Sequence, residues 1–119
     1  PVENWVDGRV TLLGDAAHPT LQYMAQGACM AMEDGVCLSY ELAASPDDHA
    51  AALERYRRQR VLRTARIQLQ SRAVGEHIYH PAGAHAALRN SIMSAKSDSE
   101  WYDTLAWLYG STGLGIATA

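Results

Sequence analysis

Residues 10–19, with the sequence VTLLGDAAHP, decide the fold of this chain. Their apolar run ends at Gly14-Asp15, a pattern typical of a buried strand that delivers one carboxylate to a sharp turn. A helix follows whose first residues, Gly27 and Ala28, are small enough for a ligand to approach the backbone amides. The sequence therefore predicts a binding site made of a strand end, a loop and a helix N-terminus. On spacing alone, Asp15 serves equally well as a cap of the following turn.

Helical patterns cover most of the chain beyond this stretch. Small and apolar residues recur at three- and four-residue steps in the first predicted helix, and Ser45 followed by Pro46 marks the start of the second. The predicted helices cover residues 27–44, about 46–77, about 84–94, and the segment from a Ser97–Glu100 capping box to Gly110. The fold class expected is mainly α with a short N-terminal β-strand over residues 9–13, covered on both faces.

Length and composition indicate one globular unit in a reducing, soluble setting. At 119 residues the chain can bury one core of moderate size. Cys29 and Cys37 lie in one predicted helix, roughly 12 Å apart along its axis, so they cannot pair. The sequence contains no signal peptide and no apolar run of about 18 residues, and we expect a cytoplasmic protein without a membrane segment. Because the sequence begins at Pro1, we expect a piece of a longer protein.

The second predicted helix carries most of the arginines. Seven of the nine lie between residues 55 and 72, which allows a nucleic-acid-binding helix as one interpretation. They occupy several helical faces, no aromatic stripe alternates with them, and the net charge of the chain is −3. Ion pairs with acids such as Glu33, Asp34 and Glu41 are therefore favoured, and no nucleic-acid partner is expected.

Three histidines, His77, His80 and His85, raise the question of a metal site. No well-spaced carboxylate or cysteine completes a tetrahedral ligand set with them. We therefore expect no metal.

The last predicted helix has an unusual amount of aromatic surface. Trp101, Trp107 and Leu108 lie on one short segment, more than a lone helix can hide. A helical self-association module without catalysis is thus the alternative to an enzyme, and a homodimer is expected.

The run Gly14–Pro19 also carries a family resemblance, together with GRVTLL before it and Gln26-Gly27 after it. It resembles the second FAD-binding motif of the single-component aromatic-ring hydroxylases, which are NAD(P)H-dependent flavoprotein monooxygenases. Residues 19–28, PTLQYMAQGA, are similar to the branch that hydroxylates hydroxybenzoates, and the similarity continues as far as Gly110. It implies a C-terminal fragment of an α/β FAD-binding fold of the glutathione-reductase-like type. Residues 1–45 then belong to the FAD-binding domain, 46–110 to a C-terminal helical region, and 111–119 to a flexible tail.

The resemblance also implies roles for individual residues. Asp15 holds the ribityl chain of FAD, Pro19 lines the reactive side of the flavin, and Gln22 faces the aromatic substrate. Backbone amides near the start of the first helix meet the N1/C2 carbonyl edge, where a helix N-terminus also favours the negative charge of reduced flavin. The implied cofactor-binding set is Gly14, Asp15, Gln26, Gly27, Ala28 and Cys29.

The chemistry implied is transfer of oxygen from O2 to an electron-rich ring through a flavin C4a-hydroperoxide, with NAD(P)H as reductant. The glycine-rich fingerprint that binds the adenine side of a dinucleotide is absent from this sequence, because the glycines at 110, 113 and 115 follow a helix and have the wrong order. We therefore expect the 119 residues alone to bind FAD weakly or not at all and to be inactive.

Overall fold

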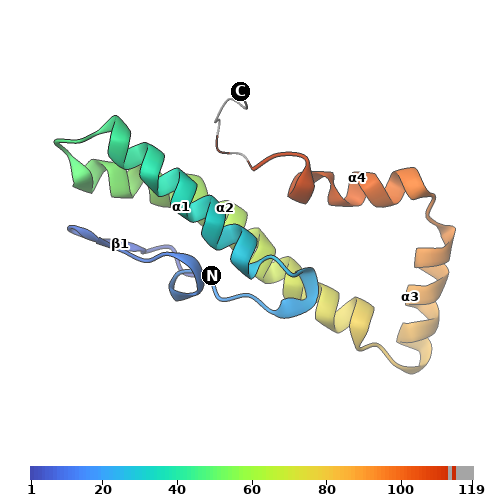
Figure 1. Cartoon of the computed structure of the whole chain (residues 1–119). Coiled ribbons are helices and arrows are strands. Elements are labelled where there is room, and N and C mark those ends of the chain that lie inside the picture. The colour runs from blue at the N-terminus through green and yellow to red at the C-terminus, as the bar shows by residue number, and fades with distance from the viewer. Residues whose placement is uncertain (113, 115–119) are drawn as a thin grey trace. The chain divides into compact units, whose positions relative to one another are not determined.

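The computed structural model describes residues 1–112 and 114, and these are mainly helical with a small two-stranded sheet (Figure 1). The predicted mainly α fold class with β structure near the N-terminus is confirmed. The elements are β1 (Val6–Asp7), β2 (Val10–Thr11), η1 (Gly14–Ala16), η2 (Gln22–Met24), α1 (Gly27–Ala44), α2 (His49–Val74), the π-turn η3 (Gly75–Tyr79), α3 (Gly83–Ala95) and α4 (Asp98–Tyr109).

The chain divides into two compact units, Pro1–Val74 and Gly75–Ala119. The first contains the β-hairpin, the loop after it, and α1 and α2. The second contains η3, α3 and α4. The functional division proposed at residue 45 concerns the parent protein and stays a prediction.

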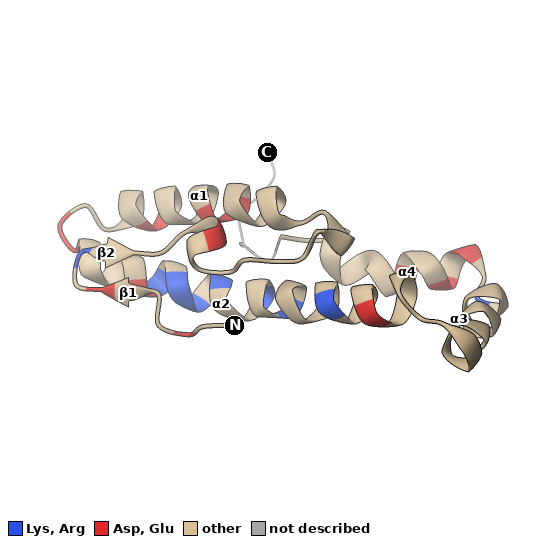
Figure 2. Cartoon of the chain, turned by 90° about the horizontal axis from the view of Figure 1, so that it is seen from below, with Lys and Arg blue, Asp and Glu red and all other residues tan. Residues whose placement is uncertain are grey.

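In the first unit, α1 and α2 lie side by side as a helical hairpin, with the β-strands beside them (Figures 1 and 2). Its apolar core combines Met30 and Cys37 of α1 with Tyr56 and Ile67 of α2, all at most 2% exposed. Trp5, just before β1, closes the core from the side of the hairpin, with its ring centroid 5.9 Å from that of Tyr56. The unit is therefore a three-part sandwich of hairpin, α1 and α2.

The predicted strand over residues 9–13 was wrong in extent and in burial. Its regular part is only Val10–Thr11, and the Val10 side chain is 67% exposed. Pairing of Asp7 with Val10 and of Val6 with Thr11 closes a hairpin over Gly8, whose φ of +57° suits the turn. The strand thus pairs with Val6–Asp7, a segment for which no strand was predicted.

The start of α2 lies three residues beyond the predicted one. The Asp48 carboxylate accepts the Ala51 amide at 3.0 Å, so Asp48 caps the helix. Ser45 instead accepts a hydrogen bond from Arg55 at 2.7 Å, and Pro46 lies in the connecting turn. The helix ends at Val74, before the predicted end near residue 77, because the chain widens into the π-helical turn η3, closed by the hydrogen bond from the His80 amide to the Gly75 carbonyl.

The other predicted helices agree closely with the structure. The first is α1 with both bounds as predicted, and α3 exceeds its prediction by one residue at each end. Ser97 and Glu100 form the predicted capping box: Ser97 donates its amide to the Glu100 carboxylate at 2.8 Å and accepts the Glu100 amide at 3.4 Å. Of the predicted tail, 111–119, residues 113 and 115–119 lie outside the described part. No helix in the described ranges is long and apolar enough to cross a membrane.

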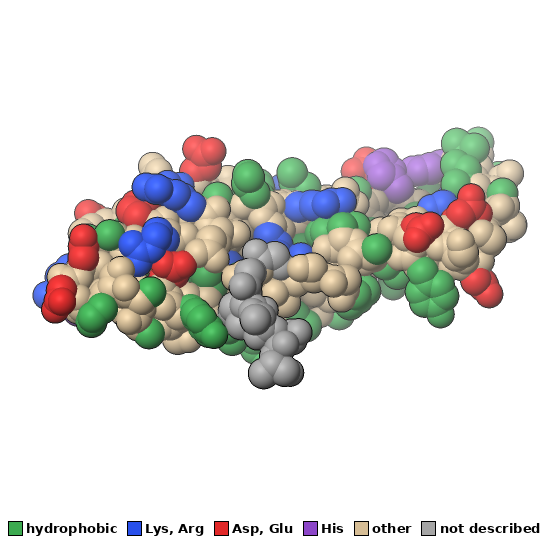
Figure 3. Space-filling model, turned by 90° about the horizontal axis from the view of Figure 1, so that it is seen from above, with side chains coloured by type: hydrophobic (Ala, Val, Ile, Leu, Met, Phe, Trp, Pro, Cys, Tyr) green, Lys and Arg blue, Asp and Glu red, His purple; other side chains and the backbone are tan. Residues whose placement is uncertain are grey.

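Histidine side chains gather at one place on the second unit (Figure 3). The rings of His77 and His85 lie 5.4 Å apart, centroid to centroid. Among the described residues, histidine, cysteine and carboxylate side chains form no group of three that could hold a metal ion.

Candidate functional site

The loop between β2 and α1, together with the first turn of α1, holds all the residues predicted to contact a ligand. Near the start of the loop lies Gly14, which is buried, has a φ of +59° and lies so near α1 that an added Cβ would stand 3.3 Å from the Ala31 Cβ. Glycine is required here for both its backbone conformation and its lack of a side chain. This close approach packs η1 directly against α1.

Asp15 lies beside the first turn of α1. Its carboxylate is exposed, and its Oδ1 is 3.9 Å from the point where a Cβ on Gly27 would stand. The first turn of α1 contains no acidic side chain, and its N-cap, Gln26, makes no side-chain capping bond. A carboxylate acceptor and the positive end of a helix therefore face the same space.

The backbone amides at this end of α1 have no acceptor within the helix. The first helical hydrogen bond runs from the Met30 amide to the Gln26 carbonyl at 2.9 Å. By helix geometry this leaves the amides of Gly27, Ala28 and Cys29 as outward-facing donors. The Gln26 side chain is buried and donates to the Met24 carbonyl at 3.2 Å, so it shapes the loop.

The far part of the loop is held by α2. The ring of Pro19 is exposed, while its carbonyl accepts a hydrogen bond from the Gln68 amide at 3.0 Å. Gln22 is exposed on η2, which packs against α2, and Ala25, in the left-handed conformation at φ +52°, turns the chain into α1. The structure thus brings Pro19 and Gln22 onto one loop with Asp15.

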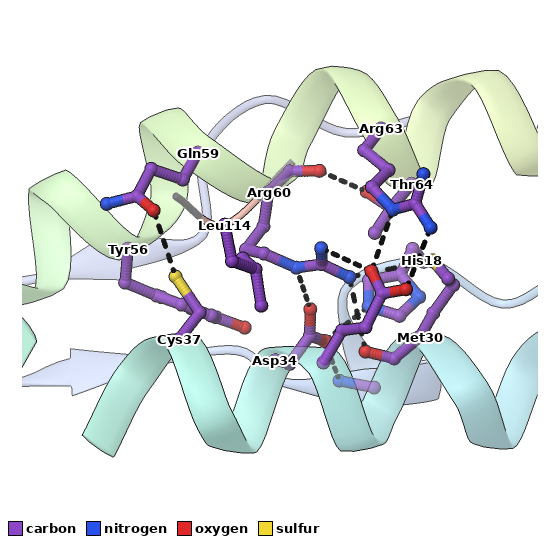
Figure 4. A network of polar contacts seen from close by, with 12 residues as sticks. His18, Met30, Asp34, Cys37, Tyr56, Gln59, Arg60, Arg63, Thr64 and Leu114 are labelled. Carbon is purple, nitrogen blue, oxygen red and sulfur yellow. Dashed lines mark hydrogen bonds and ion pairs between the residues drawn. The ribbon is translucent and has the colours of Figure 1, made fainter. Parts of the chain in front are cut away.

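A buried polar network lies beneath this loop (Figure 4). The Asp34 carboxylate of α1 accepts the Gly14 amide at 3.0 Å, lies 2.5 Å from His18 Nε2, and accepts Arg60 Nε at 2.7 Å. The side chains of Asp34 and Arg60 are fully buried, and that of His18 is 1% exposed. His18 Nδ1 is also buried and has no partner among the described residues.

Arginines of α2 also pair with two further carboxylates of α1. Glu33 accepts Arg60 Nη1 at 2.6 Å and Arg63 Nε at 2.7 Å, and Glu41 accepts Arg55 Nε at 2.5 Å. The ion pairs predicted for Glu33, Asp34 and Glu41 are therefore confirmed. Figure 2 shows the arginines along α2 in blue.

These partners lower the pKa values of Asp34 and Glu33. Burial acts to raise the pKa of Asp34, but hydrogen bonds from His18, Arg60 and the Gly14 amide outweigh it and lower that pKa. Burial likewise acts to raise the pKa of Glu33, and the guanidinium groups of Arg63 and Arg60 lower it overall. Both groups are thus held as carboxylates.

Comparison with known proteins identifies the family. Residues 1–71 match the family described as an FAD binding domain. The chain belongs to this FAD-binding family. Over 110 residues, 92% of the chain, it is 54% identical to 3-hydroxybenzoate 6-hydroxylase 1 of Aquipseudomonas alcaligenes and to 3-hydroxybenzoate 6-hydroxylase of Polaromonas naphthalenivorans. It is 41% identical to 3-amino-4-hydroxybenzoate 2-monooxygenase of Streptomyces cremeus. The matched part spans only 27–28% of the length of these relatives.

The geometry of the loop fits the cofactor of the FAD-binding family. A ribityl chain carries hydroxyl donors that an exposed carboxylate such as Asp15 accepts, and the absence of a side chain at Gly27 leaves the space beside that carboxylate open. The amides of α1 match a carbonyl edge that gains negative charge. The loop and the first turn of α1 thus offer donors and acceptors of the kinds that the hydroxyls of a ribityl chain and the carbonyl edge of a flavin can pair with.

The structure also shows contacts that hold the loop and that were not predicted from the sequence. Gln68 of α2 donates to the Pro19 carbonyl, Asp34 of α1 binds the Gly14 amide and the His18 ring, and Arg60 fixes Asp34. Gln68 had a sequence signal: it lies at helical spacing from Tyr56 and Thr64 on the buried face of α2, where a polar side chain needs a partner.

Proposed function

We propose that this chain is the C-terminal part of an FAD-dependent, NAD(P)H-using monooxygenase that hydroxylates a hydroxybenzoate-type aromatic ring. The observation that carries the proposal is the exposed Asp15 carboxylate beside the first turn of α1, within 3.9 Å of the Cβ position of Gly27. The names of the relatives, hydroxybenzoate hydroxylases and an aminohydroxybenzoate monooxygenase, support the same substrate class.

In this proposal the FAD is held by the start of α1 and by η1. Asp15 accepts the ribityl hydroxyls, Gly14 lets the backbone pass close by, and the residues 26–29 present their amides to the pyrimidine edge. When bound and reduced by NAD(P)H, the flavin supplies the transfer of oxygen from O2 to the ring. The protein contributes orientation and exclusion of water.

Pro19 and Gln22 form the substrate side in the same proposal. The exposed Pro19 ring offers an apolar surface, and the Gln22 amide both donates and accepts hydrogen bonds, which suits a phenol. An amide is no general base, so the group that takes the phenolic proton lies elsewhere in the parent protein.

We further propose that the parent has a glutathione-reductase-like FAD-binding fold. Residues 1–45 would contribute to its FAD-binding domain and 46–110 to a helical region. Because the chain lacks the glycine-rich fingerprint for the adenine side, the 119 residues by themselves would bind little FAD and show no hydroxylation.

A hybrid enzyme tests these proposals. In it, the matching 110 residues of the Aquipseudomonas alcaligenes 3-hydroxybenzoate 6-hydroxylase 1 are replaced by those of this chain. The purified hybrid should retain FAD after gel filtration and hydroxylate 3-hydroxybenzoate, with NADH and NADPH supplied in turn. Asp15→Ala should weaken FAD binding on the order of tenfold, the effect of losing a hydrogen bond to a charged group. Asp7→Ala, at another exposed carboxylate, in β1, is the control. A hybrid that folds without binding FAD would refute the assignment.

A homodimer is the second proposal, supported by the surface of α4. The residues named from the sequence do not form this surface, because Leu108 is buried and Trp101 and Trp107 are half-buried. Tyr102, Leu105 and Tyr109 lie at helical spacing and are 77%, 41% and 68% exposed. Light scattering of the chain and of Tyr102→Lys tests it: a dimer that dissociates in the variant supports this face, and a monomeric wild type rejects it.

A further inference from the structure

We infer that α2 positions the flavin-facing loop at two points, with Arg60 and Gln68 as positioning residues. The inference rests on the proposed function, because it assigns consequences to the FAD side and the substrate side of that loop. Helix α2 itself carries none of the residues proposed to touch FAD or substrate.

The first point of attachment is at Gly14. Arg60 Nε donates to Asp34 Oδ1 at 2.7 Å, and Asp34 Oδ2 accepts the Gly14 amide at 3.0 Å. Asp15 follows Gly14 directly, so the position of its backbone is fixed through this chain of contacts. The contacts from Arg60 to Asp34 and from Asp34 to Gly14 are both buried, which strengthens each of them.

The second point of attachment is at Pro19. Proline has no amide hydrogen, so its carbonyl is the group through which the backbone at this position is held. Gln68, 5% exposed, donates to that carbonyl at 3.0 Å. This contact orients the peptide that leads from Pro19 towards Gln22.

Both attachments come from one face of α2. Arg60, Thr64 and Gln68 are spaced four residues apart and are all buried. The two anchoring residues are roughly 12 Å apart along the helix axis. A rigid helix thus sets the separation between Gly14, on the FAD side, and Pro19, on the substrate side.

The two contacts should therefore have different functional roles, one for FAD binding and one for substrate orientation. Loss of the Gln68 contact should free the Pro19 side while the Arg60 and Asp34 contacts still hold Gly14 and Asp15. FAD affinity should then be kept while substrate orientation is lost. In a monooxygenase, poor orientation appears as reductant consumed without product.

Amide hydrogen exchange of the full 119-residue chain gives a readout that does not depend on activity. The Ala25 amide donates to the Gln22 carbonyl at 2.9 Å and reports the order of this part of the loop. In Gln68→Met, similar in length but without a donor, it should exchange roughly fivefold faster than in wild type, as expected for one lost hydrogen bond. Gln70→Met, on the exposed side of the same helix, should leave it unchanged. The α1 amides serve as reference: if they accelerate as much as the Ala25 amide, Gln68 only stabilises the fold and the inference fails.

The hybrid enzyme tests the functional half. Gln68→Met should keep the Kd for FAD within about twofold of the unmodified hybrid and raise the hydrogen peroxide formed per NAD(P)H severalfold over Gln70→Met. Equal peroxide yields in the two variants would overturn the inference. A hybrid that binds no FAD at all refutes the proposed function instead, while the exchange experiment still decides whether Gln68 holds the loop.

Discussion

Arg60 Nε lies 2.7 Å from Asp34 Oδ1, and neither side chain is exposed to solvent. The same guanidinium reaches Glu33 at 2.6 Å, so one arginine joins two successive residues of α1 to α2. A buried charge without its partner is strongly unfavourable, because its desolvation is no longer offset. This pair is therefore the contact on which the helical hairpin should depend most.

Removal of Arg60 should destabilise the chain severely. Arg60→Leu leaves Asp34 buried without its cation, and we expect a loss of about 3–5 kcal/mol in the free energy of unfolding, the range for a broken buried pair. Urea unfolding followed by circular dichroism measures this. Arg58→Leu, at an exposed position of the same helix, should change stability by about 0.5 kcal/mol or less. Equal midpoints for the two variants would show that the pair adds nothing to stability.

Acid should unfold the protein through the same network. The pKa values of Asp34 and Glu33 are lowered in the folded state from their ordinary values of 3.8 and 4.5. Groups of this kind contribute stability above their unfolded pKa values and lose it as the pH falls through the folded ones. The free energy of unfolding should thus vary little from about pH 7 to 5 and fall below about pH 4.5, as urea midpoints across this range can show.

Glu33→Gln isolates one contributor to this pH dependence. The variant should have a shallower acid slope than wild type, since one group that takes up a proton on unfolding is gone. Asp47→Asn, in the exposed turn before α2, controls for the loss of one negative charge. A slope equal to that of wild type in Glu33→Gln would contradict the pKa shift assigned to Glu33.

The parts of this fold that the sequence predicted are those decided by neighbours in the chain. The bounds of α1 and the Ser97–Glu100 capping box follow from local caps and helical spacing. The hairpin was missed because the two-residue strand β1 has too little pattern of its own to be recognised. The network under the loop joins residues 20 and 26 positions apart, Gly14 to Asp34 and Asp34 to Arg60, so its place is set by the packing of α1 on α2.

Gly14→Ala should lower the free energy of unfolding by more than backbone strain alone would. Its φ of +59° disfavours any side chain, and the new Cβ would stand 3.3 Å from Ala31. We expect a loss of about 2 kcal/mol or more, against about 1 kcal/mol for Gly8→Ala, which has a similar φ but no atom within 4 Å of the added Cβ. Chemical denaturation compares the two. Adding Ala31→Gly to Gly14→Ala should relieve the close contact, so the double variant should be more stable than Gly14→Ala once the cost of a glycine within a helix is subtracted. Identical losses at Gly14 and Gly8 would exclude the contact as a cause.

A large side chain at Gly27 should weaken FAD binding and have little effect on folding. It begins α1, and an alanine Cβ there would meet Asp15 Oδ1 at 3.9 Å, an ordinary contact. Gly27→Ala should therefore be tolerated in the hybrid enzyme, whereas the branched side chain of Gly27→Val would fill the space between α1 and the Asp15 carboxylate. We expect the valine variant to weaken FAD binding by tenfold or more, about 1.4 kcal/mol, as measured by flavin fluorescence titration. Gly35→Val, in the interior of α1 with no atom within 4 Å of an added Cβ, controls for the effect of valine on helix stability. If Gly27→Val and Gly35→Val bind FAD equally well, the cofactor does not use the space beside Asp15, and the flavin site must be sought elsewhere on the loop.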